Sequence, residues 1–180
     1  MKIISKYIPE RALVHVQQLL GEEVYKIYSK AIYVDINQHI FEANSFSMRS
    51  KKDFVNFETN WKDYNDYEYY ELSISKSDTP YGVKRGENGS LLTPSSISIV
   101  PASTITSIEL YEDKDVEEWN SEERELITVK YDSAFLFYQA DGNKFLIGVS
   151  ETIADLTRFI RDEKAINERL EGLSKRLEWK

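Results

Sequence analysis

Alternating apolar residues in the second half of the chain constrain its fold most strongly. Apolar side chains recur there at every second position in five short stretches, at residues 97–99, 105–111, 126–131, 134–139 and 144–149. This period is typical of β-strands with one buried face. Asp141-Gly142, between the last two stretches, favours a tight hairpin. The second half therefore predicts an antiparallel meander.

The first half mixes two periods. Proline at position 9 suits the first turn of a helix, and apolar residues follow at steps of three and four up to about residue 28, which predicts an N-terminal helix. These residues are Leu13, Val16, Leu20, Val24 and Ile27. Residues 32–41 read as a hairpin, residues 50–62 as a short helix and residues 67–75 as a strand with one solvated face.

Near the C-terminus, apolar residues again fall at steps of three and four with charged residues between them, which predicts a long amphipathic helix. They are Ile153, Leu156, Phe159, Ile160, Ile166, Leu170, Leu173 and Leu177. We therefore predict an α+β fold, in which a mostly antiparallel sheet packs with an N-terminal and a long C-terminal helix. Pleckstrin-homology-like barrels share this order of elements. For the C-terminal helix, packing on the protein's own sheet is favoured over self-association.

With 180 residues, the chain has the length of one domain and is long enough to bury a core. We predict a single compact domain over residues 1–180. Glycine and proline gather in residues 77–95, so this segment is the clearest loop and the candidate boundary between subdomains.

Composition indicates a cellular compartment and excludes several partners. The sequence has no cysteine, which suits a reducing compartment. It also shows neither a signal peptide pattern nor an apolar run long enough to span a membrane. These features predict a cytoplasmic protein. A net charge of −8 repels a phosphate backbone, so we expect no direct nucleic-acid binding. The small basic groups, such as Lys51-Lys52 and Lys84-Arg85, are expected to be solvated surface.

Most of the negative charge lies in two segments, 53–71 and 109–125. The second reads as a charged loop between strands. The first interleaves six carboxylates with five tyrosine and tryptophan residues. Either it is solvated surface, or it is an interface in which aromatic rings supply contact area and carboxylates attract a basic partner. The candidate partner-binding residues are Trp61, Asp63, Tyr64, Asp66, Tyr67 and Glu68.

No motif identifies a reaction. The chain has only two histidines, His15 and His39, and neither belongs to a zinc spacing or a recognisable catalytic arrangement. We expect no catalytic residue, metal or cofactor. Three functions stay open. The first is a non-enzymatic acidic interaction protein, such as an immunity- or antitoxin-type inhibitor of a basic effector. The second is a pleckstrin-like scaffold that binds a peptide or lipid. The third is a hydrolase that uses a carboxylate pair drawn from residues such as Glu58 and Asp63.

Overall fold

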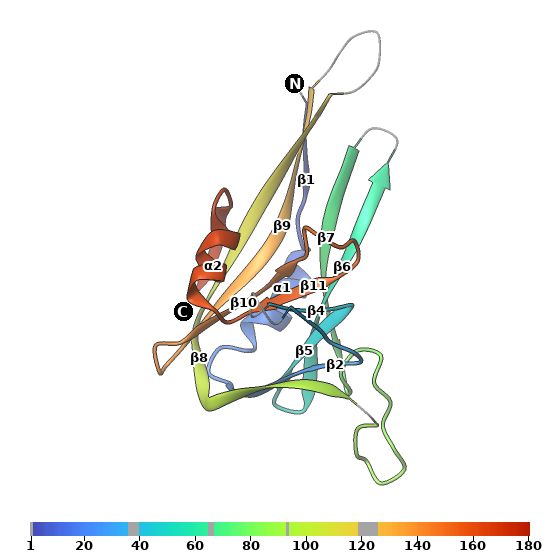
Figure 1. Cartoon of the computed structure of the whole chain (residues 1–180), viewed down its shortest axis with the longest axis vertical. Coiled ribbons are helices and arrows are strands. Elements are labelled where there is room, and N and C mark those ends of the chain that lie inside the picture. Colours follow the sequence, from blue (N-terminus) through green and yellow to red (C-terminus); the bar gives the residue numbers. More distant parts are fainter. Residues whose placement is uncertain (1, 36–39, 65–66, 93, 119–125) are drawn as a thin grey trace.

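The computed structural model describes residues 2–35, 40–64, 67–92, 94–118 and 126–180. Within these residues the chain forms one twelve-stranded, mostly antiparallel sheet and two short helices (Figure 1). The elements are β1 (Lys2–Lys6), α1 (Glu10–Gln17), β2 (Glu23–Ser29), β3 (Tyr33–Asp35), β4 (Ile40–Ala43), β5 (Ser45–Ser50), β6 (Asp53–Tyr64), β7 (Tyr67–Ser77), β8 (Ser95–Glu118), β9 (Leu126–Gln139), β10 (Lys144–Val149), β11 (Thr157–Ile160), α2 (Glu163–Leu170) and β12 (Ser174–Trp179).

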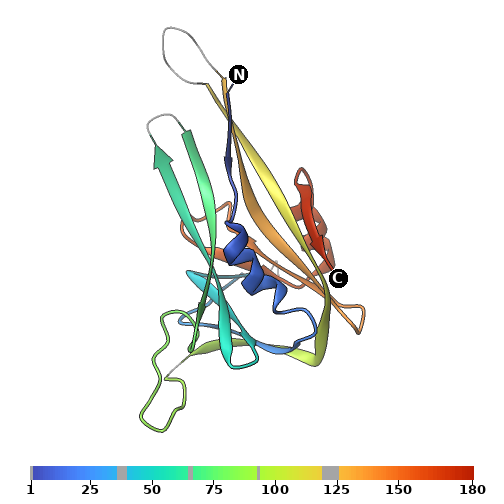
Figure 2. The same ribbon diagram turned by 180° about the vertical axis from the view of Figure 1, so that it is seen from behind.

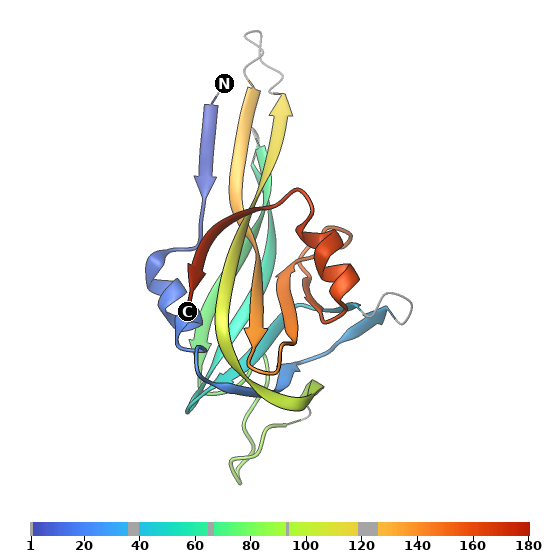
Figure 3. The ribbon, with the colours of Figure 1, turned by 90° about the vertical axis from the view of Figure 1, so that its left-hand side faces the viewer.

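The prediction of an α+β fold with a long C-terminal helix is wrong. The residues of the expected helix, 153–177, include strand β11, the eight-residue helix α2 and most of strand β12. Asp162 caps α2 by accepting the Ala165 N–H at 2.8 Å, and Gly172, at φ 87°, turns the chain out of it in a left-handed conformation open to glycine. β12 then pairs with β8 (Figure 3). The similarity to pleckstrin-homology-like barrels depended on this helix, so that prediction is wrong as well.

Apolar residues of the expected C-terminal helix pack against the protein's own sheet, as the sequence favours. Ile166 is fully buried and contacts a cluster that includes Leu136 and Leu146, with Leu170 and Leu173 packed at its margin. Phe159 and Leu177 pack in the main core instead. The three-and-four spacing thus spans separate elements that pack in two clusters.

The N-terminal helix is also shorter than predicted. α1 ends at Gln17, Gly21 adopts a left-handed φ of 79°, and the expected second half of the helix is strand β2. The pairing of β2 with β8 is interrupted between Val24, opposite Ser103, and Lys26, opposite Ser98, so the extra residues lie in β8. A bulge bends the paired strands and increases their twist, and on the two sides of this irregularity Val24 and Ile27 are both buried although they are three positions apart.

The short helix predicted over residues 50–62 is strand β6. Residues 54–57 are all buried, because the strand packs on both faces: Phe54 contacts Tyr28, and Phe57 contacts Phe135 and Phe137. Burial on both faces removes the alternation that marks a half-buried strand.

Three other predictions are confirmed. β9 and β10 form the hairpin around Asp141-Gly142, with Gly142 at φ 85°. β3 and β4 form the hairpin expected over residues 32–41, and β7 is the strand expected over residues 67–75.

The sheet follows the strand order β3-β4-β11-β10-β9-β8-β2-β5-β6-β7. The 24-residue strand β8 joins its halves, since its first part pairs with β2 and its second part with β9. The two halves face each other across the main core, where the ring centres of Phe57 on β6 and Phe135 on β9 lie 5.6 Å apart. Residues that precede the loop between β7 and β8 and residues that follow it both belong to this core.

Two long hairpins extend from this body in the same direction, β6–β7 and β8–β9 (Figures 1 and 3). We call them the arms. β1 pairs in parallel with β9, from Lys2 opposite Ile127 to Lys6 opposite Tyr131. A small cluster of Tyr69, Ile127, Val129 and Tyr131 packs between the arms. Side chains of both hairpins therefore hold the arms side by side.

Replacing Gly148 by alanine is expected to lower the free energy of unfolding by about 1–3 kcal/mol, because a methyl group overpacks the sheet there. An added Cβ would lie 2.7 Å from the Ser133 carbonyl oxygen and 2.9 Å from the Ala134 Cβ. Thermal or chemical denaturation measures the change. Gly86→Ala is the control: its Cβ would meet only side-chain atoms at 3.2–3.3 Å, and a change below about 0.5 kcal/mol is expected. Equal effects of the two substitutions would contradict the prediction.

Candidate functional site

The two acidic segments of the sequence lie on the two arms. Residues 53–71 run along β6 and β7, and residues 109–118 belong to β8. The second segment is therefore a paired strand up to Glu118 and not the loop that its charge predicted; residues 119–125 lie outside the described residues. Tyr131 of β9 lies between the arms, with its ring centre 6.2 Å from that of Tyr69 and 6.5 Å from that of Tyr70.

Alternation along the β6–β7 hairpin separates the candidate residues onto two faces. Residues directly opposite in an antiparallel pair share a face, and the next pair along lies on the other face. Trp61 is opposite Tyr70, and Asp63 is opposite Glu68, on one face. Tyr64 and Tyr67 are opposite each other on the other face. Asp66 lies outside the described residues. The six candidates therefore do not form one surface.

The segment between β10 and β11 approaches the edge of β6 near Trp61 (Figure 1). The Trp61 N–H donates to Asp155 Oδ1 at 2.6 Å, and the neighbouring Thr59 hydroxyl accepts from the Thr157 hydroxyl at 3.1 Å. Asp155 has φ 60°, a left-handed conformation that aspartate tolerates better than most residues. The chain after β10 is thus fixed to the edge of β6.

Carboxylates from three parts of the chain, β7, β8 and the segment after β10, act on Tyr70. Burial raises the pKa of the Tyr70 hydroxyl, and the negative charges of Asp115, Glu151, Glu68 and Asp155 raise it further. Asp115 also accepts from the Tyr131 hydroxyl at 3.1 Å. Since all four charges act on one phenol, the region between the arms is rich in negative charge. Glu151 also pairs with Arg169 Nη1 at 3.1 Å.

We name this region the acidic arm surface. It consists of Trp61, Asp63, Glu68, Tyr70, Asp115, Glu151 and Asp155. Trp61 is its exposed aromatic residue, at 41 % exposure. Sequence reasoning missed Glu151 and Asp155, because both lie far from the two acidic segments in a stretch that reads as helix. Neither residue has a sequence signal that would single it out.

The opposite face of the β6–β7 hairpin carries the tyrosines. Rings of Tyr64 and Tyr67 stack with centres 5.1 Å apart, and the Lys6 ammonium lies 5.5 Å from both centres and 5.7 Å from that of Tyr69. Such distances allow cation–π attraction. Figure 2 shows β1, which carries Lys6, between the arms on this side. The protein's own lysine therefore occupies this aromatic face.

Asp63→Lys is expected to raise the free energy of unfolding by about 0.5 kcal/mol, because like charges directly opposite in a sheet are destabilising and opposite charges are favourable. Asp63 and Glu68 are such a pair, and both are exposed. The control is the same substitution in a Glu68→Gln background, where the gain should be smaller. An equal gain in both backgrounds would show that the pair does not interact.

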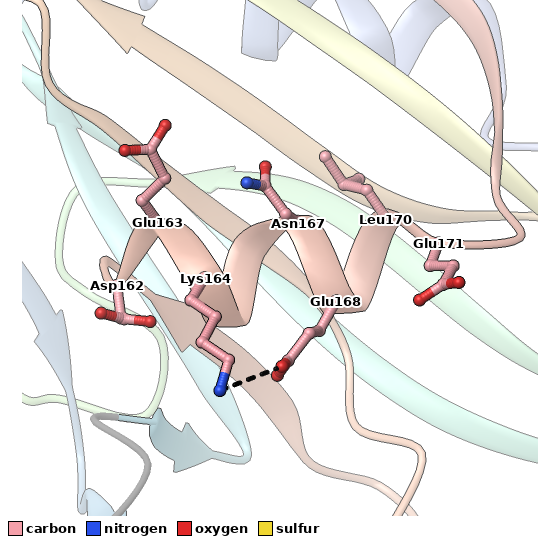
Figure 4. Close-up of a pocket in the computed structure, with 7 residues that line it drawn as sticks. All are labelled: Asp162, Glu163, Lys164, Asn167, Glu168, Leu170 and Glu171. Atoms are coloured by element: carbon pink, nitrogen blue, oxygen red, sulfur yellow. Dashed lines mark ion pairs between the residues drawn. The ribbon is translucent and has the colours of Figure 1, made fainter.

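Elsewhere the chain offers little that resembles a reaction site. A surface hollow of about 920 Å³ beside α2 is wide open to solvent. Figure 4 shows its side chains spread along the helix, where Lys164 pairs with Glu168 at 3.6 Å. Among the described residues, no group of three or more histidine and acidic side chains is placed to hold a metal. Among these described residues, neither α1 nor α2 is long and apolar enough to cross a membrane.

Comparison with known proteins adds no relative. No protein-family model matches the sequence, no curated protein resembles it closely enough to count as a match, and no solved structure matches the fold.

Proposed function

We propose that this chain is a non-enzymatic interaction protein that binds a basic protein partner through the acidic arm surface. The observation that carries the proposal is the position of the exposed Trp61, whose main-chain N–H donates to Asp155 Oδ1 at 2.6 Å, on the hairpin face that also carries Asp63 and Glu68. The charges of Glu68, Asp115, Glu151 and Asp155 together raise the pKa of the neighbouring Tyr70. These residues come from β7, β8 and the segment after β10. Concentrated negative charge of this kind speeds association with a cationic protein and orients its approach.

Trp61 supplies apolar contact area, which the carboxylates do not provide. Its side chain is 41 % exposed, while its main chain is fixed both by the β6–β7 pairing and by Asp155. Exposed, rigidly held aromatic side chains bind partners at low entropic cost and dominate many interfaces. Trp61 is therefore the anchor in our proposal, and the carboxylates beside it attract the partner.

The unfavourable pair of Asp63 and Glu68 supports an interaction role. Two carboxylates directly opposite each other reduce the stability of the hairpin, and a basic partner would relieve their repulsion. A hydrolase would need its carboxylates in a sheltered pocket, whereas Asp63 and Glu68 are both exposed. The exposed geometry therefore favours binding over catalysis.

An immunity- or antitoxin-type inhibitor of a basic effector is the particular form that we propose. Such a protein needs an acidic surface that covers the cationic cleft of its target, and the acidic arm surface has the required charge.

Affinity capture from the source organism tests the proposal. Tagged protein is incubated with lysate, washed at low or high ionic strength, and the retained proteins are identified by mass spectrometry. We expect one predominant basic protein, released by high salt because exposed charges more than about 10 Å apart are largely screened at 0.1 M salt. Retention of an acidic partner, or of the same partner at every ionic strength, would contradict the proposal.

A further inference from the structure

The turn between β5 and β6 lies at the end of the molecule away from the arms (Figure 1) and borders a cavity of about 290 Å³. Its lining contains three lysines and one acidic residue in a chain whose net charge is −8. The lining residues are Gln18, Ser50, Lys51, Lys52, Asp53 and Lys76. Local charge is therefore opposite in sign to that of the chain as a whole.

Ion pairing leaves two of the three lysines available. Lys76 pairs with Asp53 at 2.8 Å and donates to Gln18 Oε1 at 3.4 Å. Lys51 and Lys52 are exposed, and within the described residues neither ammonium group forms an ion pair. The cavity thus has a net positive charge that internal carboxylates do not cancel.

The turn itself is held in a fixed and unfavourable conformation. Lys51 has φ 52°, a left-handed value that side chains such as lysine rarely adopt. Its N–H donates to Glu22 Oε2 at 3.2 Å, and its carbonyl accepts from Arg49 Nε at 3.2 Å. Strain of this kind is commonly found at binding sites, where the surrounding structure maintains it.

We propose that this cavity binds a phosphate group, free or as the phosphomonoester of a small molecule. Ammonium groups bind phosphate through charge-assisted hydrogen bonds, and the Lys51 and Lys52 ammoniums are available for them. The Gln18 amide can donate as well, since only its oxygen is used by Lys76. The volume of about 290 Å³ exceeds that of a single phosphate and leaves room for a small organic group. This site is separate from the acidic arm surface.

A titration of the ¹⁵N-labelled full chain, followed by NMR, tests the proposal with inorganic phosphate and with glycerol phosphate at constant ionic strength. We expect saturable shifts confined to the amides around the cavity, including Lys51, Lys52 and Lys76. Tighter binding of glycerol phosphate would identify a phosphomonoester as the better ligand; equal binding would identify the phosphate group alone. Linear shifts scattered over the surface, or no shifts, would overturn the proposal.

Substitutions then test whether Lys51 and Lys52 bind the phosphate. Lys51→Gly with Lys52→Ala removes both available ammoniums, and glycine suits the left-handed turn, so the fold should persist. Phosphate binding should weaken at least about tenfold, because charge-assisted hydrogen bonds are lost. Lys164→Ala with Lys180→Ala is the control with the same change in net charge, and it should bind phosphate like the unaltered protein. Equal weakening in both variants would show an effect of net charge and overturn the site.

Discussion

Asp132→Ala is expected to lower the free energy of unfolding by about 3–5 kcal/mol, because it leaves a largely buried guanidinium without its partner. Asp132 is 1 % exposed. Its two oxygens accept from Arg176 Nε at 2.6 Å and Nη2 at 2.7 Å, and one of them also accepts the Ile8 N–H at 2.7 Å. One carboxylate on β9 therefore joins β12 to the segment between β1 and α1.

Equilibrium denaturation measures this loss, and two controls make it specific. Glu168→Ala removes an exposed pair with Lys164 and should cost about 0.5 kcal/mol or less. The double variant Asp132→Ala/Arg176→Met should recover part of the loss, because no unpaired charge is then left behind. A loss below about 1 kcal/mol for Asp132→Ala would show that the pair contributes no more than a typical single contact.

Trp61→Ala is expected to weaken binding of the basic partner by about 30-fold or more, the effect of losing about 2 kcal/mol at a central aromatic anchor. The main-chain bond from residue 61 to Asp155 does not need the indole, so the fold should persist. Calorimetric titration with the captured partner measures the change.

Tyr81→Ala is the matched control for that substitution. Tyr81 is also an exposed aromatic residue, at 48 % exposure, but it belongs to the loop between β7 and β8, which lies at the end of the molecule opposite the arms (Figures 1 and 2). Its removal should leave affinity unchanged within about twofold. If Tyr81→Ala weakens binding and Trp61→Ala does not, the partner binds the other end of the molecule.

Sequence patterns predicted those parts of the fold that are fixed by neighbouring residues. Asp141-Gly142 defines the β9–β10 hairpin because its backbone requirement is local, and β7 keeps the alternation of a half-buried strand. The helical predictions failed where a three-and-four spacing runs across separate elements. Val24 and Ile27 match a helix although they lie on the two sides of an irregularity in the β2–β8 pairing, and Leu173 and Leu177 match one although Gly172 has ended α2.

The candidate site was predicted in part for the same reason. Composition drew attention to Trp61, Asp63 and Glu68, which the hairpin places on one face. Tyr64 and Tyr67 lie on the other face because a strand alternates, whereas the sequence predicts a helix over residues 50–62 and therefore gives no register for the hairpin. The contribution of Asp155 depends on the segment between β10 and β11 reaching β6, and a contact across 94 positions of sequence leaves no local pattern.

The most direct test of the acidic arm surface is the rate of association with the captured partner at a series of salt concentrations. The test variant carries Asp63→Asn, Glu68→Gln and Asp155→Asn, three nearly isosteric changes in which the amide oxygen introduced at position 155 can still accept the Trp61 N–H. The control carries Glu163→Gln, Glu168→Gln and Glu171→Gln on and beside α2, with the same change in net charge. Our account predicts that only the arm variant loses rate, by about tenfold at low salt, and that its salt dependence becomes shallower. Equal rates and equal salt dependence for the two variants would contradict it.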